Sequence, residues 1–193
     1  FASLTVLSTN NKGKVKEIKE ILKNEDIKTL KEMNINIEIE ETGETFETNA
    51  LIKARKIYSL TNTACIADDS GICIEELDGF PGVKTARFLG ENATQEDRNN
   101  YLIKRLEGIP KAKRTVQFIT CIAYIDSQGN EKIYKGILSG YIAEAPRGNN
   151  GFGFDEIFEL EDGRTLAELE TEEKNNISSR KIALKKLAQD INR

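Results

Sequence analysis

Two adjacent carboxylates, followed by a hydroxyl and a glycine, are the side chains of this sequence best suited to acid–base or metal chemistry. They lie in the run Ala67-Asp68-Asp69-Ser70-Gly71, between the apolar runs 63–67 and 72–74. Two like charges between buried strands are costly unless a cation or a proton donor meets them. Asp, Ser and Gly are also ordinary turn residues, so the run by itself fits either a solvated turn or a functional site.

The absence of histidine restricts the chemistry further. With none in 193 residues, Ser-His-Asp catalysis, Cys-His catalysis and histidine metal sites are excluded. A divalent metal would have to sit on oxygen ligands, which favours magnesium or manganese. The acidic run 40–44 (Glu-Glu-Thr-Gly-Glu) is a second source of such oxygens, although it also fits a solvated loop.

The composition is that of a folded chain with an acidic balance. Charged residues make up 31% of the sequence and hydrophobic residues 38%, with a net charge of -4. This balance argues against nucleic acid as a partner, and no apolar run approaches the roughly 20 residues that span a bilayer. Because Cys65, Cys73 and Cys121 lie in apolar runs and no signal peptide is evident, we expect reduced thiols and a cytoplasmic location.

A strand, a polar turn and a helix are predicted at the start of the chain. Residues 4–8 predict a buried strand, and residues 15–22 carry the apolar face of a helix. Between them, residues 9–14 (Thr-Asn-Asn-Lys-Gly-Lys) offer backbone N–H groups at a helix start and two lysines. That combination suits a phosphate, and it equally suits an ordinary capped turn.

The remaining patterns predict further strands and helices. Residues 24–36 are polar and poorly patterned, whereas apolar and polar residues alternate over 35–39, as in a half-exposed strand. A helix over residues 45–60 places Lys53 near its inward side, within reach of an anion. The other predicted elements are a helix starting at residue 94, an antiparallel hairpin of residues 115–125 and 132–145, and a helical end after residue 171.

An aromatic–glycine segment, Phe152-Gly153-Phe154-Asp155, follows the loop 146–151. Its aromatics either pack in a core or form a flat platform for a base, since glycine allows close approach. Polar clusters in α/β proteins gather ligands where strands end and helices begin. Five such clusters, residues 9–14, 40–44, 68–71, 152–155 and 174–180, together indicate a nucleoside triphosphate site.

Six segments carry a resemblance that spans nearly the whole chain. They are Ser8 to Lys14 with Glu17; Glu41-Thr42-Gly43 through Phe46, Asn49-Ala50 and Lys53-Ala54; Ala67 to Gly71; Gly79-Phe80-Pro81-Gly82 with Ala86-Arg87-Phe88; Gly151 to Asp155; and Ala167-Glu168-Leu169 through Glu173-Lys174 to Ser178-Ser179-Arg180. In this order they resemble the Ham1/inosine triphosphatase family, nucleoside triphosphate pyrophosphatases that act on non-canonical purines such as ITP, dITP and XTP.

The resemblance implies an α/β fold. Residues 1–193 would form a single, elongated, two-lobed domain with a central mixed β-sheet flanked by helices and an active site in the cleft between the lobes. It also implies a homodimer, a purine nucleoside triphosphate substrate, and Mg²⁺ as cofactor, with Mn²⁺ as a substitute. The implied reaction is hydrolysis to the monophosphate and pyrophosphate, which cleanses the nucleotide pool.

The resemblance also implies residue roles. Asp69 would accept the proton of the attacking water and, with Glu40 or its neighbour Glu41, hold the metal. The triphosphate would lie against Thr9, Asn10, Asn11, Lys12, Gly13 and Lys14, with Lys53 on a phosphate and Ser70 touching the substrate. Phe152, Gly153, Phe154 and Asp155 would hold the base and sugar, and Lys174, Ser179 and Arg180 would complete the pocket.

Two departures from the family pattern stand out. The family normally has Ser-His-Arg where this chain has Ser178-Ser179-Arg180, and proline where it has Glu156. Serine is shorter and carries no charge, so a catalytically weakened nucleotide-binding or regulatory relative stays open as an alternative. An aspartyl-phosphate phosphatase built on Asp68 and Asp69 is a second alternative.

Overall fold

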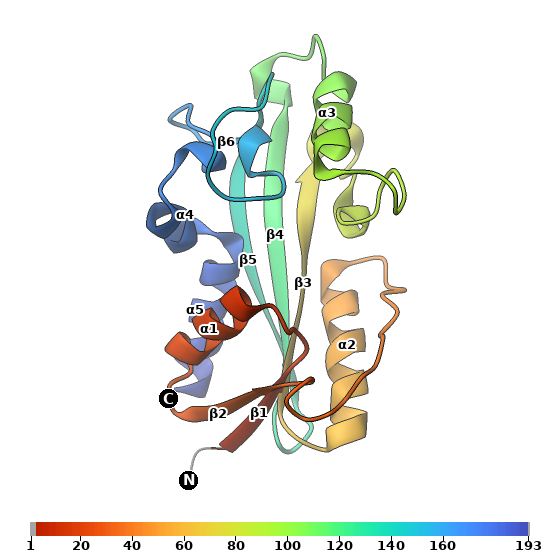
Figure 1. Cartoon of the computed structure of the whole chain (residues 1–193), viewed down its shortest axis with the longest axis vertical. Coiled ribbons are helices and arrows are strands. Elements are labelled where there is room, and N and C mark those ends of the chain that lie inside the picture. Colours follow the sequence, from red (N-terminus) through yellow and green to blue (C-terminus); the bar gives the residue numbers. More distant parts are fainter. Residues whose placement is uncertain (1–2, 193) are drawn as a thin grey trace. The chain divides into compact units, whose positions relative to one another are not determined.

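The structure, a computed structural model, describes residues 3–192 and has an α/β fold (Figure 1). Within these residues a six-stranded sheet runs in the order β2-β1-β3-β4-β5-β6. β1 pairs in parallel with β2 and β3, and β5 pairs antiparallel with β6, so the sheet is mixed, as predicted. The strands are β1 (Ser3–Leu7), β2 (Glu25–Thr29), β3 (Cys65–Ile74), β4 (Thr115–Ile125), β5 (Glu131–Ile142) and β6 (Phe158–Glu159).

The helices begin where their capping residues predict. Thr45 Oγ1 accepts a hydrogen bond from the backbone of Thr48 (3.0 Å), and Thr94 and Asp97 form a reciprocal capping box. No helix in the described part of the chain is long and apolar enough to cross a membrane. The α-helices are α1 (Lys12–Ile21), α2 (Phe46–Thr61), α3 (Gln95–Arg105), α4 (Thr171–Ile177) and α5 (Ser179–Ile191).

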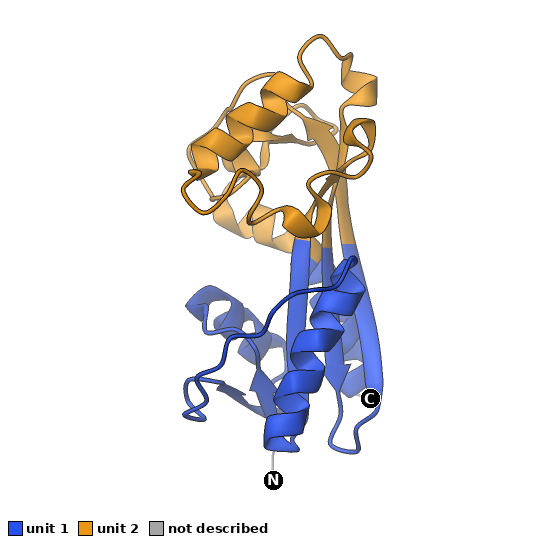
Figure 2. Cartoon of the chain, turned by 90° about the vertical axis from the view of Figure 1, so that its right-hand side faces the viewer, with its two compact units in different colours: residues 1–70, 120–136, 180–193 blue, residues 71–119, 137–179 orange. Residues whose placement is uncertain are grey.

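The chain divides into two compact units, coloured separately in Figure 2. Unit 1 comprises residues 1–70, 120–136 and 180–193, and unit 2 comprises residues 71–119 and 137–179. Each unit buries its own apolar clusters.

In unit 1, side chains that alternate along the strands are covered on both faces of the sheet. On one face Leu7 and Ile66 pack with α1 and α5, and on the other face Val6 and Ala67 pack with α2. In unit 2, residues of β3, β4 and β5 pack with α3 and with the segment around Phe154. Since β3 passes from unit 1 into unit 2 at residues 70–71, its residues contribute to both cores.

The structure excludes the turn that was one alternative for residues 68–71, and it contradicts the predicted strand over residues 35–39. Residues 68–71 form no turn, because β3 continues through them from Cys65 to Ile74. Residues 35–39 form no strand; their isoleucines pack against the α2 cluster without a ladder of backbone bonds. The strand lies earlier, at β2, where only Ile27 and Thr29 are buried and the apolar signal is therefore weak.

Candidate active site

The continuity of β3 separates the two adjacent carboxylates. Successive side chains of a strand point to opposite faces, so Asp68 lies on the side of α1 and α5 and Asp69 on the side of α2. Their neighbours differ accordingly. Asp68 contacts the cations Lys14 and Arg180, whereas Asp69 lies in the field of Glu41 as well as Lys53.

Asp68 is held as a carboxylate by two cations. Arg180 Nη1 lies 2.8 Å from its Oδ2, and Lys14 Nζ lies 3.5 Å from the same oxygen. Burial alone would raise the pKa of Asp68, but the charges of Arg180 and Lys14 outweigh it and hold the pKa at about 2. Asp68 is therefore ionised at neutral pH, and its partners are fixed in place.

Asp69 has the opposite electrostatic environment. Burial, together with the negative charge of Glu41, raises the pKa of its carboxyl to about 6, and Lys53 and the side-chain amide of Asn49 oppose the shift. Its Oδ2 atom is buried and has no hydrogen-bond partner within residues 3–192. A carboxylate with a pKa near neutrality and an uncommitted oxygen is suited to accept a proton or to bind a cation.

The acidic loop, residues 40–44, is joined to α2 by an ion pair and a hydrogen bond. Glu41 pairs with Lys53 of α2 at 3.0 Å, and the Gly43 N–H donates to Asn49 Oδ1 at 2.8 Å. Asn49 is only 1% exposed, and a Cβ at Gly43 would come within 2.7 Å of its Oδ1. Glycine therefore allows the loop to approach α2 this closely.

Of the two predicted metal ligands in this loop, Glu41 is the one whose charge acts on Asp69, whereas Glu40 is exposed. Within the described residues, no group of three or more Cys, Asp or Glu side chains could hold a metal ion. Magnesium needs no such group, because it binds through one or two carboxylates and takes its other oxygens from water and substrate phosphates. The free Oδ2 of Asp69 and the nearby Glu41 fit that requirement.

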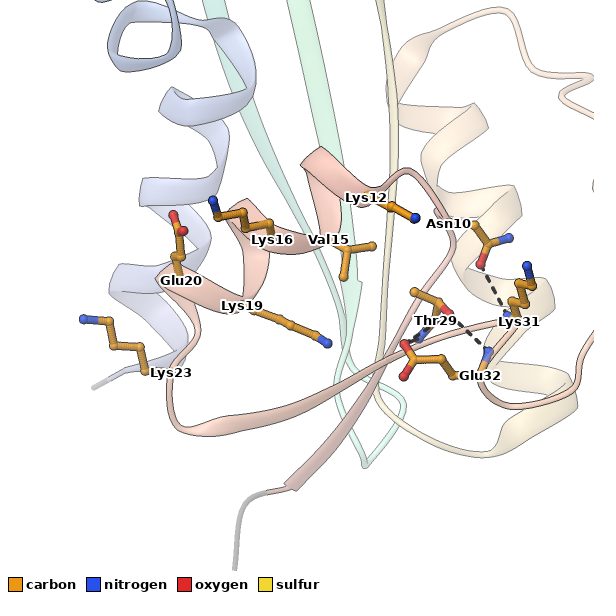
Figure 3. A pocket seen from close by; sticks show the side chains of 10 residues that line it. All are labelled: Asn10, Lys12, Val15, Lys16, Lys19, Glu20, Lys23, Thr29, Lys31 and Glu32. Atoms are coloured by element: carbon orange, nitrogen blue, oxygen red, sulfur yellow. Dashed lines mark hydrogen bonds between the residues drawn. The ribbon is translucent and has the colours of Figure 1, made fainter. Parts of the chain in front are cut away.

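The predicted phosphate-binding segment, residues 9–14, divides into two sets of side chains. Lys14 turns to Asp68, while Asn11 caps α1 by accepting from the Lys14 N–H (3.1 Å), and Thr9 Oγ1 accepts from the Asn11 N–H (3.1 Å). Asn10 and Lys12 instead line a separate pocket of about 660 Å³ beside α1 and β2 (Figure 3). Because neither Lys14 nor Lys53 lines this pocket, the role of Asn10 and Lys12 on a triphosphate stays a prediction.

In unit 2 the predicted aromatic platform consists of Phe152. Its ring is 83% exposed, with Lys174 Nζ 4.3 Å from the ring centroid. Asp155 is 3% exposed; its Oδ2 accepts from the Phe152 N–H at 2.9 Å and pairs with Lys174. Phe154 is buried and stacks on Phe88 with centroids 6.3 Å apart, so its side chain belongs to the core.

Gly151 allows the chain to pass close to Asp155 in this arrangement. Its φ is +73°, and a Cβ there would collide with Asp155 Oδ2. We expect Gly151→Ala to cost about 1–3 kcal/mol of unfolding free energy and to weaken base binding, because both backbone strain and overpacking act at one point. Chemical denaturation would measure the loss. Gly163→Ala, also at positive φ but with open space around its Cβ, separates strain from collision, and an equal loss in both variants would contradict the collision.

The other predicted site residues are placed as follows. Ser70 is half-buried in β3, Gly153 is half-buried after Phe152, and Ser179 is 4% exposed at the first position of α5. Glu156, which replaces the family's proline, accepts a hydrogen bond from Asn99 (3.1 Å). Asn49 and Asn99 are buried polar residues that sequence reasoning missed as parts of the site. A polar residue in phase with the apolar stripe of its helix was the available signal.

The fold and the site define an α/β protein whose paired carboxylates and lysines suit a ligand that carries phosphates. A sequence profile described as the Ham1 family matches residues 5–190. The chain belongs to the Ham1 family.

Relatives of known sequence and structure cover nearly the whole chain. A dITP/XTP pyrophosphatase of Thermoanaerobacter sp. (strain X514) is 47% identical over 189 residues, which are 96% of this chain and 95% of that protein. The dITP/XTP pyrophosphatase of Bacillus subtilis (strain 168) is 46% identical, covering 95% and 94% of the two chains. The solved structure of the Staphylococcus aureus Ham1 protein matches with a TM-score of 0.93 and 35% identity over 98% of each chain.

Proposed function

We propose that this chain hydrolyses dITP, ITP and XTP to the nucleoside monophosphate and pyrophosphate, and so removes non-canonical purines from the nucleotide pool. Membership of the Ham1 family and the relatives named dITP/XTP pyrophosphatase support this reaction. The single observation that carries it in this chain is Asp69, with its raised pKa and its buried, unpartnered Oδ2. Neither the structure nor the comparisons favour a non-catalytic relative.

In this proposal unit 1 provides the acid–base and phosphate chemistry. Asp69 takes a proton from the attacking water, and Lys53 stabilises negative charge on the phosphates. Asp68 holds Lys14 and Arg180 in place, so that these cations are oriented before the substrate arrives. The water hydrolyses the anhydride linkage between the α and β phosphoryl groups, which releases the monophosphate and pyrophosphate.

Asp69 and Glu41 would hold Mg²⁺, or Mn²⁺ in its place, since both metals prefer oxygen ligands. When bound, the metal neutralises phosphate charge and orients water. In unit 2 the exposed ring of Phe152 would stack on the purine, with Lys174 beside it. A 6-oxo group suits the hydrogen-bond donors of the site, whereas the 6-amino group of adenine would set donor against donor.

The family resemblance supports a homodimer, and the buried thiols of Cys65 and Cys121 support a reducing, cytoplasmic location. Burial raises the pKa of Cys65 and of Cys121 to about 12, and Cys121 also hydrogen-bonds Glu47. These two thiols are therefore inert and have no part in the proposed chemistry.

The test is a substrate panel with pyrophosphate detection. We expect the purified chain to release pyrophosphate from ITP, dITP and XTP when Mg²⁺ is present, far more slowly from ATP, whose purine carries a 6-amino group, and not at all after chelation. Pyrophosphate release from ATP as fast as from ITP would contradict the proposed specificity. Release from no nucleotide would contradict the activity, and full activity after chelation would contradict the role of the metal.

A further inference from the structure

A buried asparagine of α3 holds the segment that carries Phe152. Asn99 is 1% exposed, and its Nδ2 donates both to the carbonyl of Gly153 (3.2 Å) and to Glu156 Oε1 (3.1 Å). Its Oδ1 accepts from Gln95 Nε2 at 2.8 Å. The side-chain amide therefore uses both donor hydrogens and its oxygen, and it is fixed from the helix side by Gln95.

The two bonds of Asn99 hold the chain just after Phe152, at Gly153 within the turn 152–155 and at Glu156 just beyond it. Gly153 directly follows Phe152 and has φ +65°, a conformation in which glycine gives the backbone little restraint of its own. Glu156 lies three residues later, in the short helix Asp155–Ile157. On the other side, Asp155 accepts from the Phe152 N–H and pairs with Lys174. The turn is thus restrained from two sides, by Lys174 through Asp155 and by Asn99 directly.

The burial of Asn99 favours a specific role for this contact. A buried amide is costly unless its groups are paired, and an apolar residue in the same phase as Leu102 would pack at this position without that cost. The first turn of α3 also borders the cavity beside Phe152, which is about 330 Å³ in volume and is lined by Gln95, Glu96 and residues 148–156 except Phe154. Asn99 is hydrogen-bonded to three residues that line this cavity, Gln95, Gly153 and Glu156, and so joins that turn of α3 to the loop.

We propose that Asn99 is a positioning residue for the purine of the substrate: it fixes Gly153 and Glu156 so that the Phe152 ring is presented in one orientation. This inference rests on the proposed function, because it takes Phe152 as the surface on which the base stacks. Asn99 itself touches neither the base nor the phosphates. Its removal should therefore weaken binding of the base end of a nucleotide and leave the phosphate end unchanged.

The experiment compares two ligands that separate these ends. Inosine monophosphate carries the base, and inorganic tripolyphosphate carries only a phosphate chain. We expect Asn99→Ala to weaken inosine monophosphate binding, measured by calorimetry, by about tenfold or more, since two hydrogen bonds to the loop are lost. Tripolyphosphate binding should stay within about twofold, because removing a contact remote from the phosphate groups costs it little.

Asn100→Ala is the matched control, because it removes the same residue type from the next, exposed position of α3. It should leave both ligands unaffected. Equal loss of both ligands in Asn99→Ala would show a general structural defect and overturn the positioning role, as would unchanged inosine monophosphate binding.

A second pair of variants covers the case in which Asn99→Ala does not fold. Glu156→Gln keeps the acceptor oxygen for Asn99, whereas Glu156→Ala deletes it, and Glu156 is only half-buried. We expect weaker inosine monophosphate binding in Glu156→Ala and near-normal binding in Glu156→Gln. Equal binding in these two variants would overturn the inference. If the wild type turns over ITP while these binding effects are absent, the positioning role is wrong and the proposed function stands; if the wild type does not turn over ITP, both fail.

Discussion

Replacing Asp69 by asparagine should lower kcat for ITP by about 10³-fold, the range typical of a lost general base. Asparagine has nearly the same shape but accepts no proton at neutral pH, so binding of inosine monophosphate in the absence of metal should change little. Steady-state kinetics and calorimetric titration with inosine monophosphate would measure the two effects. Asp26→Asn, the same substitution at an exposed position of β2, is the control. Wild-type-like turnover in Asp69→Asn would contradict the assignment of the base.

The same variant should be more stable than the wild type at alkaline pH. Burial raises the pKa of Asp69 from 3.8 to about 6 in the folded chain. The folded chain therefore binds this proton more tightly than the unfolded chain does. The resulting stabilisation of the fold is complete below the unfolded pKa and is lost as the pH rises through 6. With an allowance for solvent at this half-exposed group, Asp69→Asn should gain about 1–2 kcal/mol at pH 8 and nothing below about pH 3. A variant less stable than the wild type at pH 8 would contradict the raised pKa.

Replacing Asp68 by asparagine should have the opposite effect on stability. Arg180 and Lys14 lower the pKa of Asp68 to about 2 in the folded chain, against an ordinary value of 3.8. The stabilisation is present above the unfolded pKa and is lost as the pH falls through 2. At pH 7, Asp68→Asn should lose about 2 kcal/mol of unfolding free energy, because two partly buried cations lose their shared partner.

Denaturant titrations of Asp68→Asn at pH 7 and pH 3 would test this expectation, and the difference from the wild type should shrink at the lower pH. Asp162→Asn is the control, since Asp162 also pairs with an arginine, Arg164, at 2.8 Å but lies on the surface. It should change stability little. A loss in Asp68→Asn that is the same at both pH values would show that packing, rather than charge, is responsible.

The sequence predicted the helices and the long strands of the chain but not how Asp68 and Asp69 differ. Caps such as Thr45 and the Thr94–Asp97 box are local, so they can be predicted from spacing alone. The separation of the two carboxylates depends on β3 being continuous, which the turn-forming composition of residues 68–71 concealed. Pairing with β1 and cover from helices on both faces override that local preference.

The candidate site was predictable in its residue types and less so in its contacts. Phe152 and Phe154 are equivalent in the sequence, yet one is exposed and the other is buried, because only Phe154 meets Phe88 in the core of unit 2. Glu40 and Glu41 are adjacent and of the same residue type, and the contact with Lys53 distinguishes them. Such choices depend on tertiary contacts between residues far apart in the chain, which periodicity does not encode.

The products of ITP hydrolysis test the central claim most directly. We expect equimolar inosine monophosphate and pyrophosphate, measured by chromatography of a single reaction, with neither inosine diphosphate nor orthophosphate formed. The Asp69→Asn variant should form both products about 10³-fold more slowly under the same conditions. Release of orthophosphate with inosine diphosphate by the wild type would contradict the account, because it would place the attack at the terminal phosphoryl group.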